Sequence, residues 1–256
     1  MLGAWRGACR RGNALQSEKR QALNAKRSPI PPPAPVDVGL FGGSFDPPHI
    51  AHLIVAETVR EQFGLGQVWW MPAHTPPHKA EASPPQHRLA MTQRATASNP
   101  AFAVCREEIE RGGASYTVET LRRLQEHHPD TRFSLVLGGD SLAGFPSWRE
   151  PEEIARRAAQ LLVYRRPGET AGDDDLPSHI AEHVRFADAP LLNVSATDLR
   201  ARRRRGRSLR YLVPAPVRAY IEKHDLYRTT NDERQTAKGP SRTPSSDFRP
   251  SRRESS

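Results

Sequence analysis

The chain has few cysteines and no long hydrophobic run, and each shortage excludes a class of protein. Its 256 residues include two cysteines, Cys9 and Cys105, which are too few for a disulfide framework. Cys105 lies in an apolar, strand-like pattern that is typical of a small core residue. No apolar stretch approaches the roughly 20 residues that cross a bilayer. The N-terminal segment also lacks the apolar centre of a secretory signal. We therefore expect a soluble, cytoplasmic protein.

Acidic residues are scarce only at the two ends of the chain. Residues 1–35 and 228–256 together hold 14 of the 38 Lys and Arg residues but only 5 of the 29 Asp and Glu residues. Residues 36–227 therefore carry 24 of each sign and are formally neutral. Because the excess positive charge belongs to the ends, it is weak support for nucleic-acid binding by the middle of the chain. Nucleic-acid binding through the basic tails remains open as a remote alternative.

Both ends also have the composition of disordered segments. Residues 1–35 are rich in Arg and finish in a run of prolines, and residues 228–256 are rich in Ser, Pro and Arg. We expect a disordered N-terminal extension over 1–35, one folded domain over 36–227 and a disordered tail over 228–256. An Arg-rich, acid-poor start also fits an organelle transit peptide, and a start codon assigned too early explains it equally well.

Between the ends, strand-like and helix-like patterns alternate. Strands are expected at 36–41, 67–73, 102–109, 133–137, 160–164 and 184–187. Helices are expected at 50–63, 84–98, 117–127, 151–159, from Ser195 onward and at 214–224. This alternation predicts an α/β fold with a doubly wound, Rossmann-like parallel sheet. Ligands of such sheets bind beyond the carboxyl ends of the strands.

The first predicted strand leads into a glycine turn and then into a helix that starts with two histidines. Gly42 and Gly43 are expected to break the strand and to let the backbone approach a ligand closely. A pair of prolines then presets the helix start. His49 and His52 share one face of the first turn, where free N–H groups and the helix dipole attract anions. This pattern predicts a phosphate site, and the simpler alternative is two surface histidines after a tight turn.

Two further positions carry polar groups suited to a nucleotide. Ser195 can cap a helix through its hydroxyl, and Thr197 and Arg200 follow within about a turn and a half. The guanidinium of Arg200 offers a fixed fork of donors to phosphate oxygens, although an ordinary N-cap before a solvated basic helix is the alternative. The arginines at 202–205 are interpreted as a solvated face. Asp140, after the strand at 133–137, is placed to accept bonds from ribose hydroxyls or to cap the next helix.

The segment from Gly42 to His52 resembles the HxGH nucleotidyltransferases, in which a GG-S/T-FDPxHxGH segment binds the phosphates of ATP. Ala51 stands where that superfamily usually has Gly. The segment from Ser195 to Arg200 resembles its ISxTxxR segment, which holds the triphosphate opposite the two histidines. The resemblance implies catalytic roles for His49, His52 and Arg200. It implies ATP contacts for Gly42, Gly43, Ser44, Phe45, Ser195 and Thr197, and the ribose bonds expected of Asp140 add one more contact with ATP.

Other segments resemble one family within that superfamily, the bacterial nicotinate-nucleotide adenylyltransferases. The similar segments keep one order across about 36–227, and they are 76–79, 113–121, 147–148, 163–168 and 211–214. The resemblance implies that Trp148 stacks on a pyridine ring and that the backbone of Tyr116 and Thr117 lines the nicotinate carboxylate. Lys79 and Arg165 are implied to bind the same mononucleotide. The simpler interpretations are a rim aromatic for Trp148 and a solvated loop charge for Lys79.

The implied reaction is adenylyl transfer from ATP to nicotinate mononucleotide, giving deamido-NAD and pyrophosphate in NAD biosynthesis. The attacking oxygen belongs to a phosphate that is already ionised, so catalysis reduces to alignment and charge stabilisation. The sequence has no dense carboxylate cluster for a metal of its own, so Mg²⁺ is expected to arrive with ATP. Nicotinamide mononucleotide or another phosphate, such as pantetheine phosphate, remains an alternative substrate. Tyr116, Thr117 and Trp148 argue against the latter.

Overall fold

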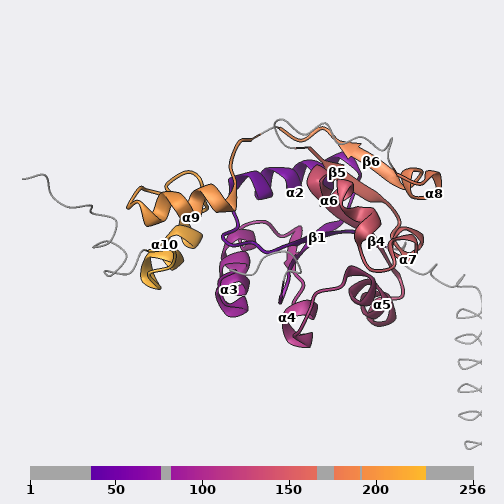
Figure 1. The fold of residues 1–256 in the computed structure, drawn as a ribbon, viewed down its shortest axis with the longest axis horizontal. Helices are drawn as coiled ribbons and strands as arrows, with labels where there is room; N and C mark the ends of the chain where they lie inside the picture. The colour runs from indigo at the N-terminus through magenta and orange to yellow at the C-terminus, as the bar shows by residue number, and fades with distance from the viewer. Residues whose placement is uncertain (1–35, 76–81, 166–175, 191, 229–256) are drawn as a thin grey trace, which may run out of the picture. The chain divides into compact units, whose positions relative to one another are not determined.

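The computed structural model describes residues 36–75, 82–165, 176–190 and 192–228 (Figure 1). The N-terminal extension over 1–35 and the C-terminal tail from residue 229 lie outside the described residues. Lys79, for which the family resemblance implies a role, also lies outside them.

One parallel sheet forms the centre of the fold. Its strands are β1 (Val36–Gly43), β2 (Gln67–Pro72), β3 (Phe102–Val104), β4 (Thr131–Gly138), β5 (Leu161–Tyr164) and β6 (Val184–Ala187). Their spatial order is β3-β2-β1-β4-β5-β6, and every neighbouring pair is parallel. This order confirms the predicted doubly wound, Rossmann-like class. The strand order reverses between β1 and β4, and the crevice at their carboxyl ends is where such sheets bind ligands.

The helices follow the strands nearly where the sequence predicts them. They are α2 (Ile50–Gln62), α3 (Pro85–Thr96), α4 (Glu107–Arg111), α5 (Thr117–His127), α6 (Gly139–Ala143), α7 (Pro151–Arg157), α8 (Ser178–Ala181), α9 (Ala196–Arg204) and α10 (Ala215–Lys223), with a 3₁₀ turn, η1 (Phe145–Ser147). Prolines at or just before the first residue begin α3, α7 and α10. Such prolines are favoured there because the first helical N–H groups have no partner in the helix.

Two local predictions are wrong. The strand predicted over 102–109 ends at Val104, and α4 begins at Glu107. Acidic side chains in the first turn of α4 favour a helix start, because they face the positive end of the helix dipole. Gly42 and Gly43 continue β1 instead of breaking it, and they pair with the last two residues of β2. The turn toward α2 therefore begins at Ser44.

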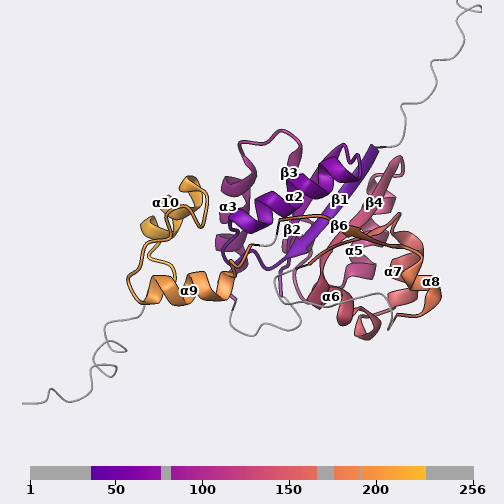
Figure 2. The ribbon, with the colours of Figure 1, turned by 90° about the horizontal axis from the view of Figure 1, so that it is seen from above.

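Alternating residues of the central strands pack on opposite faces of the sheet. Val38 and Leu40 of β1 lie in a core cluster with α5, α6, α7 and α8, whereas Phe41 lies in a second cluster with α2. Figures 1 and 2 show α2 on one side of the sheet and α5 to α7 on the other. Cys105 follows β3, is half-buried and packs against the first cluster, and burial raises the pKa of its thiol to about 11.

A third apolar cluster joins α3 to the C-terminal helices. Its buried members are Met91, Ala95, Leu199, Leu209, Val213, Val217 and Ile221. Figure 2 shows α9 and α10 beside α3, at the end of the sheet where β1 turns into α2. The backbone N–H of Ile50, the first residue of α2, donates to the carbonyl of Leu212 at 3.0 Å. The cluster therefore holds α9 against the turn that carries the two histidines. None of the helices described is long and apolar enough to cross a membrane.

Candidate active site

The start of α2 brings two imidazole rings into contact. His49 is the N-cap of α2, and His52 is the third residue of the helix. The backbone N–H of His49 donates to Nδ1 of His52 at 3.2 Å, and the two rings stack with centroids 3.6 Å apart. Because Nδ1 of His52 accepts, the neutral ring carries its proton on Nε2. Nε2 of His52 is therefore a donor, next to a helix N-terminus that itself favours anions.

Aromatic rings pack against His52 of this pair. Phe45 has a left-handed backbone with φ of 47° and is 2% exposed. Its ring lies 5.3 Å from the ring of His52 and 5.1 Å from that of Trp70. A Cβ on Gly43 would come within 3.2 Å of the Phe45 ring, so a larger residue there would make the ring shift. The side chain of Phe45 therefore packs against His52, and the ATP contact that the resemblance implies would have to come from its backbone.

The start of α9 brings a guanidinium to the same turn. Arg200 donates from Nη1 to the backbone carbonyl of Asp46 at 2.8 Å and from Nη2 to the hydroxyl of Thr197 at 3.3 Å. Ser195 caps α9, since its Oγ accepts from the backbone N–H of Asp198 at 3.1 Å. This confirms the predicted cap. Two segments about 150 residues apart in sequence therefore converge on one turn.

A pocket lies beside the histidine pair, at the carboxyl ends of β1 and β5. It is lined by His49, Ala51, His52, Val55, Tyr164, Arg165, Pro190, Leu192 and Val194. Arg165, which the family resemblance assigns to the mononucleotide, lies in this pocket with the histidines, and its guanidinium covers the ring of Phe186 at 4.3 Å. Asp140 is exposed in the first turn of α6, directly after β4, and its Oδ1 accepts from the backbone N–H of Ser141 at 2.8 Å.

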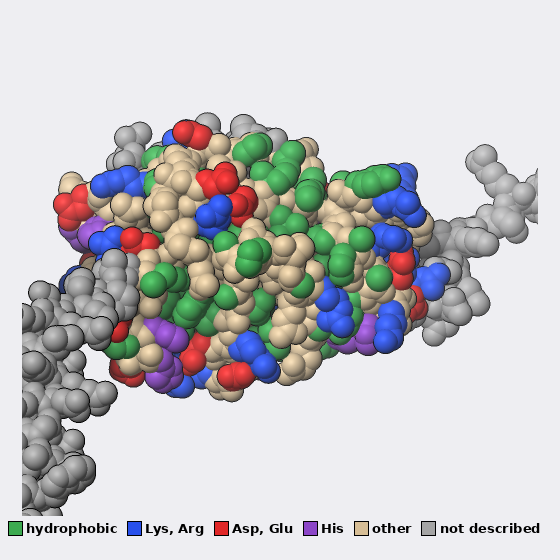
Figure 3. Space-filling view, turned by 180° about the vertical axis from the view of Figure 1, so that it is seen from behind, with side chains coloured by type: hydrophobic (Ala, Val, Ile, Leu, Met, Phe, Trp, Pro, Cys, Tyr) green, Lys and Arg blue, Asp and Glu red, His purple; other side chains and the backbone are tan. Residues whose placement is uncertain are grey.

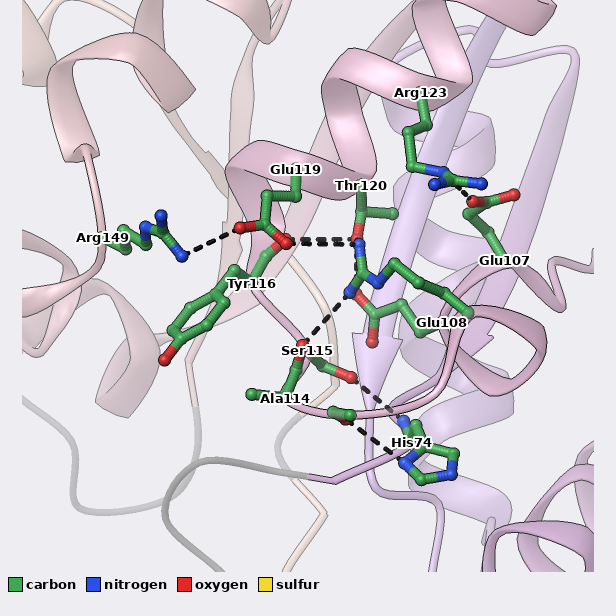
Figure 4. Close-up of polar contacts among 12 residues, drawn as sticks. His74, Glu107, Glu108, Ala114, Ser115, Tyr116, Glu119, Thr120, Arg123 and Arg149 are labelled. Atoms are coloured by element: carbon green, nitrogen blue, oxygen red, sulfur yellow. Dashed lines mark hydrogen bonds and ion pairs between the residues drawn. The ribbon is translucent and has the colours of Figure 1, made fainter.

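The family resemblance assigns the other half of the candidate site to the loop before α5 (Figure 4). Tyr116 is the N-cap of α5, and Thr117 is its first residue. The backbone N–H of His74, after β2, donates to Oγ of Ser115 at 3.0 Å. The guanidinium of Arg149 lies 4.8 Å from the centre of the Tyr116 ring and donates to Glu119 at 2.8 Å. These contacts join the loops that follow β2, α4 and η1.

A buried carboxyl group lies behind this loop. Glu108 is 4% exposed and accepts from the hydroxyl of Thr120 at 2.9 Å. Burial raises the pKa of Glu108, and the hydrogen bonds from Ser115 and Thr120 oppose that shift. Trp148 follows η1, is half-buried and packs on Phe145 with ring centroids 5.2 Å apart. Glu108 therefore fixes the loop from inside, while Trp148 leaves part of its ring accessible.

Sequence reasoning missed a buried arginine that joins the two halves. Arg88 of α3 is fully buried, and its guanidinium donates to backbone carbonyls. The acceptors are Ser44 at 3.0 Å, Ala73 at 2.5 Å, His74 at 2.7 Å and Ser83 at 2.9 Å. Burial lowers the pKa of Arg88, and the charge of Asp46 opposes that shift. Nothing in the local pattern of α3 indicates this role, because every acceptor is a backbone group in another segment or before the helix.

The residues in the described ranges include no group of three or more His, Cys, Asp or Glu side chains that could hold a metal ion. A divalent ion therefore finds no cage of side chains there. Phosphate oxygens of a bound nucleotide are the alternative ligands for a hard cation at this place.

Comparison with known proteins places the chain among nucleotidyltransferases. The cytidylyltransferase-like family model matches residues 40–202. A probable nicotinate-nucleotide adenylyltransferase of Salinibacter ruber is 59% identical over 196 residues, covering 76% of this chain and 99% of the relative. Its counterpart in Exiguobacterium sibiricum is 42% identical over 193 residues, covering 75% and 99%. The fold is similar to that of Plasmodium falciparum nicotinic acid mononucleotide adenylyltransferase complexed with NaAD, with a TM-score of 0.62 at 19% identity over 75% of this chain and 97% of that one.

Proposed function

Because the chain belongs to the nicotinate-nucleotide adenylyltransferases, within the cytidylyltransferase-like family, we propose that it transfers the adenylyl group of ATP to nicotinate mononucleotide. The products are deamido-NAD and pyrophosphate, and the reaction belongs to NAD biosynthesis. The observation that carries the proposal is the convergence of His49, His52 and Arg200 on the turn after β1. That turn lies at the strand-order reversal where doubly wound sheets bind nucleotides.

The transfer requires alignment and charge stabilisation from the protein. A phosphate oxygen of the mononucleotide forms a bond to the α-phosphorus of ATP, and the bond between the α-phosphorus and the bridging oxygen to the β-phosphate breaks. The nucleophile is already ionised at neutral pH, so no protein group has to remove its proton. Negative charge grows on the departing pyrophosphate, where His49, Nε2–H of His52 and the guanidinium of Arg200 stabilise it.

Members of this enzyme class generally use a divalent metal ion. We propose Mg²⁺, carried in by the phosphates of ATP as part of the substrate, where it offsets negative charge. The lack of a side-chain cage in the described ranges supports delivery with the nucleotide. Backbone groups of Gly42, Gly43, Ser44 and Phe45 surround the phosphates in this proposal. Ser195 and Thr197 complete the triphosphate site, and Asp140 accepts bonds from the ribose.

The loop before α5 receives the pyridine ring. Trp148 stacks on the flat ring, and backbone N–H groups at Tyr116 and Thr117 meet its carboxylate at a helix start. Arg165 and Lys79 serve the mononucleotide phosphate. The position of Arg165 beside the histidines supports this, because the attacking phosphate has to lie next to the triphosphate.

The chemistry of this loop favours the acid over the amide. Backbone donors form charge-assisted bonds with a carboxylate, each roughly twice as strong as a neutral bond. The amide has to place an NH₂ group against the same donors, which leaves a buried group unmatched at a cost of about 1–3 kcal/mol. We therefore expect nicotinate mononucleotide to exceed nicotinamide mononucleotide by more than about tenfold in kcat/KM.

Pyrophosphate release from ATP and Mg²⁺ tests the proposal with each acceptor in turn. Nicotinate mononucleotide, nicotinamide mononucleotide and pantetheine phosphate form the three arms. Equal kcat/KM for the first two would remove the preference for the acid, and a preference for the amide would reverse it. Turnover with pantetheine phosphate alone would refute the assignment of the substrate.

On the face shown in Figure 3, basic and acidic side chains are interspersed, which does not favour nucleic-acid binding by that face.

A further inference from the structure

One buried carboxyl group links three segments of the chain at the phosphate side. Asp46, in the turn between β1 and α2, is 2% exposed. Its Oδ1 accepts from the hydroxyl of Tyr227 at 2.5 Å, and its Oδ2 accepts from the backbone N–H of Ser83 at 2.9 Å. The backbone carbonyl of the same residue accepts from Arg200 at 2.8 Å. The conformation of Asp46 therefore sets where the guanidinium of Arg200 is held.

Tyr227 reaches Asp46 from the end of the folded region. It lies beyond α10, with a left-handed backbone of φ 60° that a non-glycine residue adopts only when surrounding contacts hold it. The ring packs against the third apolar cluster, and the backbone N–H of Leu226 donates to Ile221 at 3.0 Å. Burial, and then the neighbouring Asp46, raise the pKa of Tyr227. Its hydroxyl therefore keeps its proton and acts as the donor to Asp46.

We propose that Tyr227 is a positioning residue for the adenylyl transfer, acting through Asp46 to orient Arg200 toward the triphosphate. This inference rests on the proposed function. A guanidinium has five N–H donors, so the bonds to Asp46 and Thr197 fix its plane and leave donors for phosphate oxygens. Without the tyrosine hydroxyl, Oδ1 of Asp46 loses its donor in a buried place, and the turn shifts to find another.

Other contacts of this turn confine the effect of Tyr227 to Asp46. Arg88 holds the carbonyl of Ser44 on one side and that of Ser83 on the other. The histidine pair is held by its own stacking and by the bond from the backbone N–H of His49. Loss of one hydroxyl therefore leaves the fold and the histidines in place while it releases the carbonyl that Arg200 uses.

The test is Tyr227→Phe in the full chain, with Tyr220→Phe as the matched control. The hydroxyl of Tyr220 bonds Nδ1 of His87 at 2.9 Å, so it also ties the C-terminal helices to α3 but does not touch the phosphate side. We expect Tyr227→Phe to lower kcat by about tenfold, which is less than the roughly 10²-fold loss that a 1 Å misplacement of a positioned group can cause. The KM for nicotinate mononucleotide should stay within about twofold, and Tyr220→Phe should leave both constants within about twofold.

Combining Tyr227→Phe with Arg200→Lys distinguishes an effect of Tyr227 on the position of Arg200 from an effect on the stability of the fold. If Tyr227 acts through Arg200, adding Tyr227→Phe to Arg200→Lys should cost less than about twofold in kcat. Asp46→Asn should reproduce the loss and should not add to Tyr227→Phe, which also covers the case in which the tyrosine variant folds poorly. A Tyr227→Phe enzyme with wild-type kcat, an equal loss in Tyr220→Phe, or a full tenfold loss on the lysine background would overturn the inference. Absence of pyrophosphate release by the wild-type enzyme would instead count against the proposed function.

Discussion

On the phosphate side of the site, which comprises His49, His52 and Arg200, buried groups and backbone atoms hold the functional side chains. The rings of His49 and His52 stack on each other, and the fully buried Arg88 is bonded to backbone carbonyls around them. On the pyridine side, which comprises Tyr116, Thr117 and Trp148, the buried Glu108 holds the loop before α5 from inside, and ion pairs at the surface hold its outer side chains. In the pair between Arg149 and Glu119, the side chains are 51% and 35% exposed. The two halves of one site therefore differ in how rigidly their parts are fixed.

This difference matches the chemistry that we propose for each half. Charge on the departing pyrophosphate is stabilised only by donors that are already in position, because reorienting them during the reaction costs free energy. A planar ring is held by stacking and by a few backbone donors, and such contacts tolerate small shifts. We therefore expect substitutions on the phosphate side to lower kcat strongly. Substitutions among the exposed pairs of the pyridine side should change KM weakly.

His52→Ala should have the largest effect. Removing one donor to a developing negative charge typically costs on the order of 10²–10³ in rate. His52 is the donor that the helix start and the bond from His49 orient, so kcat should fall by that factor at an unchanged melting temperature. The control is His127→Ala, at the exposed end of α5. Turnover of His52→Ala within about threefold of wild type would contradict the assignment of the phosphate side.

Arg200→Lys should have a smaller but clear effect. The charge is kept, but an ammonium group cannot bond Asp46, Thr197 and a phosphate with the geometry of a planar fork. We expect kcat/KM for ATP to fall by about tenfold. Arg204→Lys, at the exposed end of the same helix, is the control. If lysine is tolerated fully at 200, the segment that begins at Ser195 is a helix cap and the basic side chain is a surface group.

The phosphate side is also the part that the sequence predicts best. The segment from Gly42 to His52 is contiguous, so the spacing of its prolines and histidines gives the helix start directly, although the two glycines continue β1. The cap by Ser195 is likewise local and is confirmed. The bonds of Arg88 and of Tyr227 to Asp46 join residues that are far apart in the chain, and no local pattern reports them. Their partners become evident only when α3 and the residues after α10 pack around the turn that follows β1.

In the segment that leads toward the pyridine side, the local sequence pattern is itself ambiguous. Residues 102–109 begin with an apolar run that favours a strand, and the acidic residues after it favour a helix start. A short apolar run cannot decide between the two, and packing against β2 supports a strand only as far as Val104. The buried bonds of Glu108 therefore could not be foreseen, because they require α4 to face the loop before α5.

Arg149→Ala should have the smallest effect, and it tests most directly whether the pyridine side is fixed less rigidly than the phosphate side. The guanidinium covers the Tyr116 ring and pairs with Glu119, but both charged groups are partly solvated. Exposed pairs of this kind typically contribute less than about 1 kcal/mol, so KM for nicotinate mononucleotide should rise about two- to threefold with kcat unchanged. Salt screens such pairs, so high ionic strength should raise the wild-type KM toward that of the variant.

The control is Arg122→Ala. Arg122 lies in α5 like Glu119, and its loss removes an ion pair with Glu150 without touching Tyr116, so the KM of this variant should match wild type. A tenfold fall of kcat in Arg149→Ala would show that the pyridine side is as rigidly required as the phosphate side, because weak, screened pairs could not then account for its geometry.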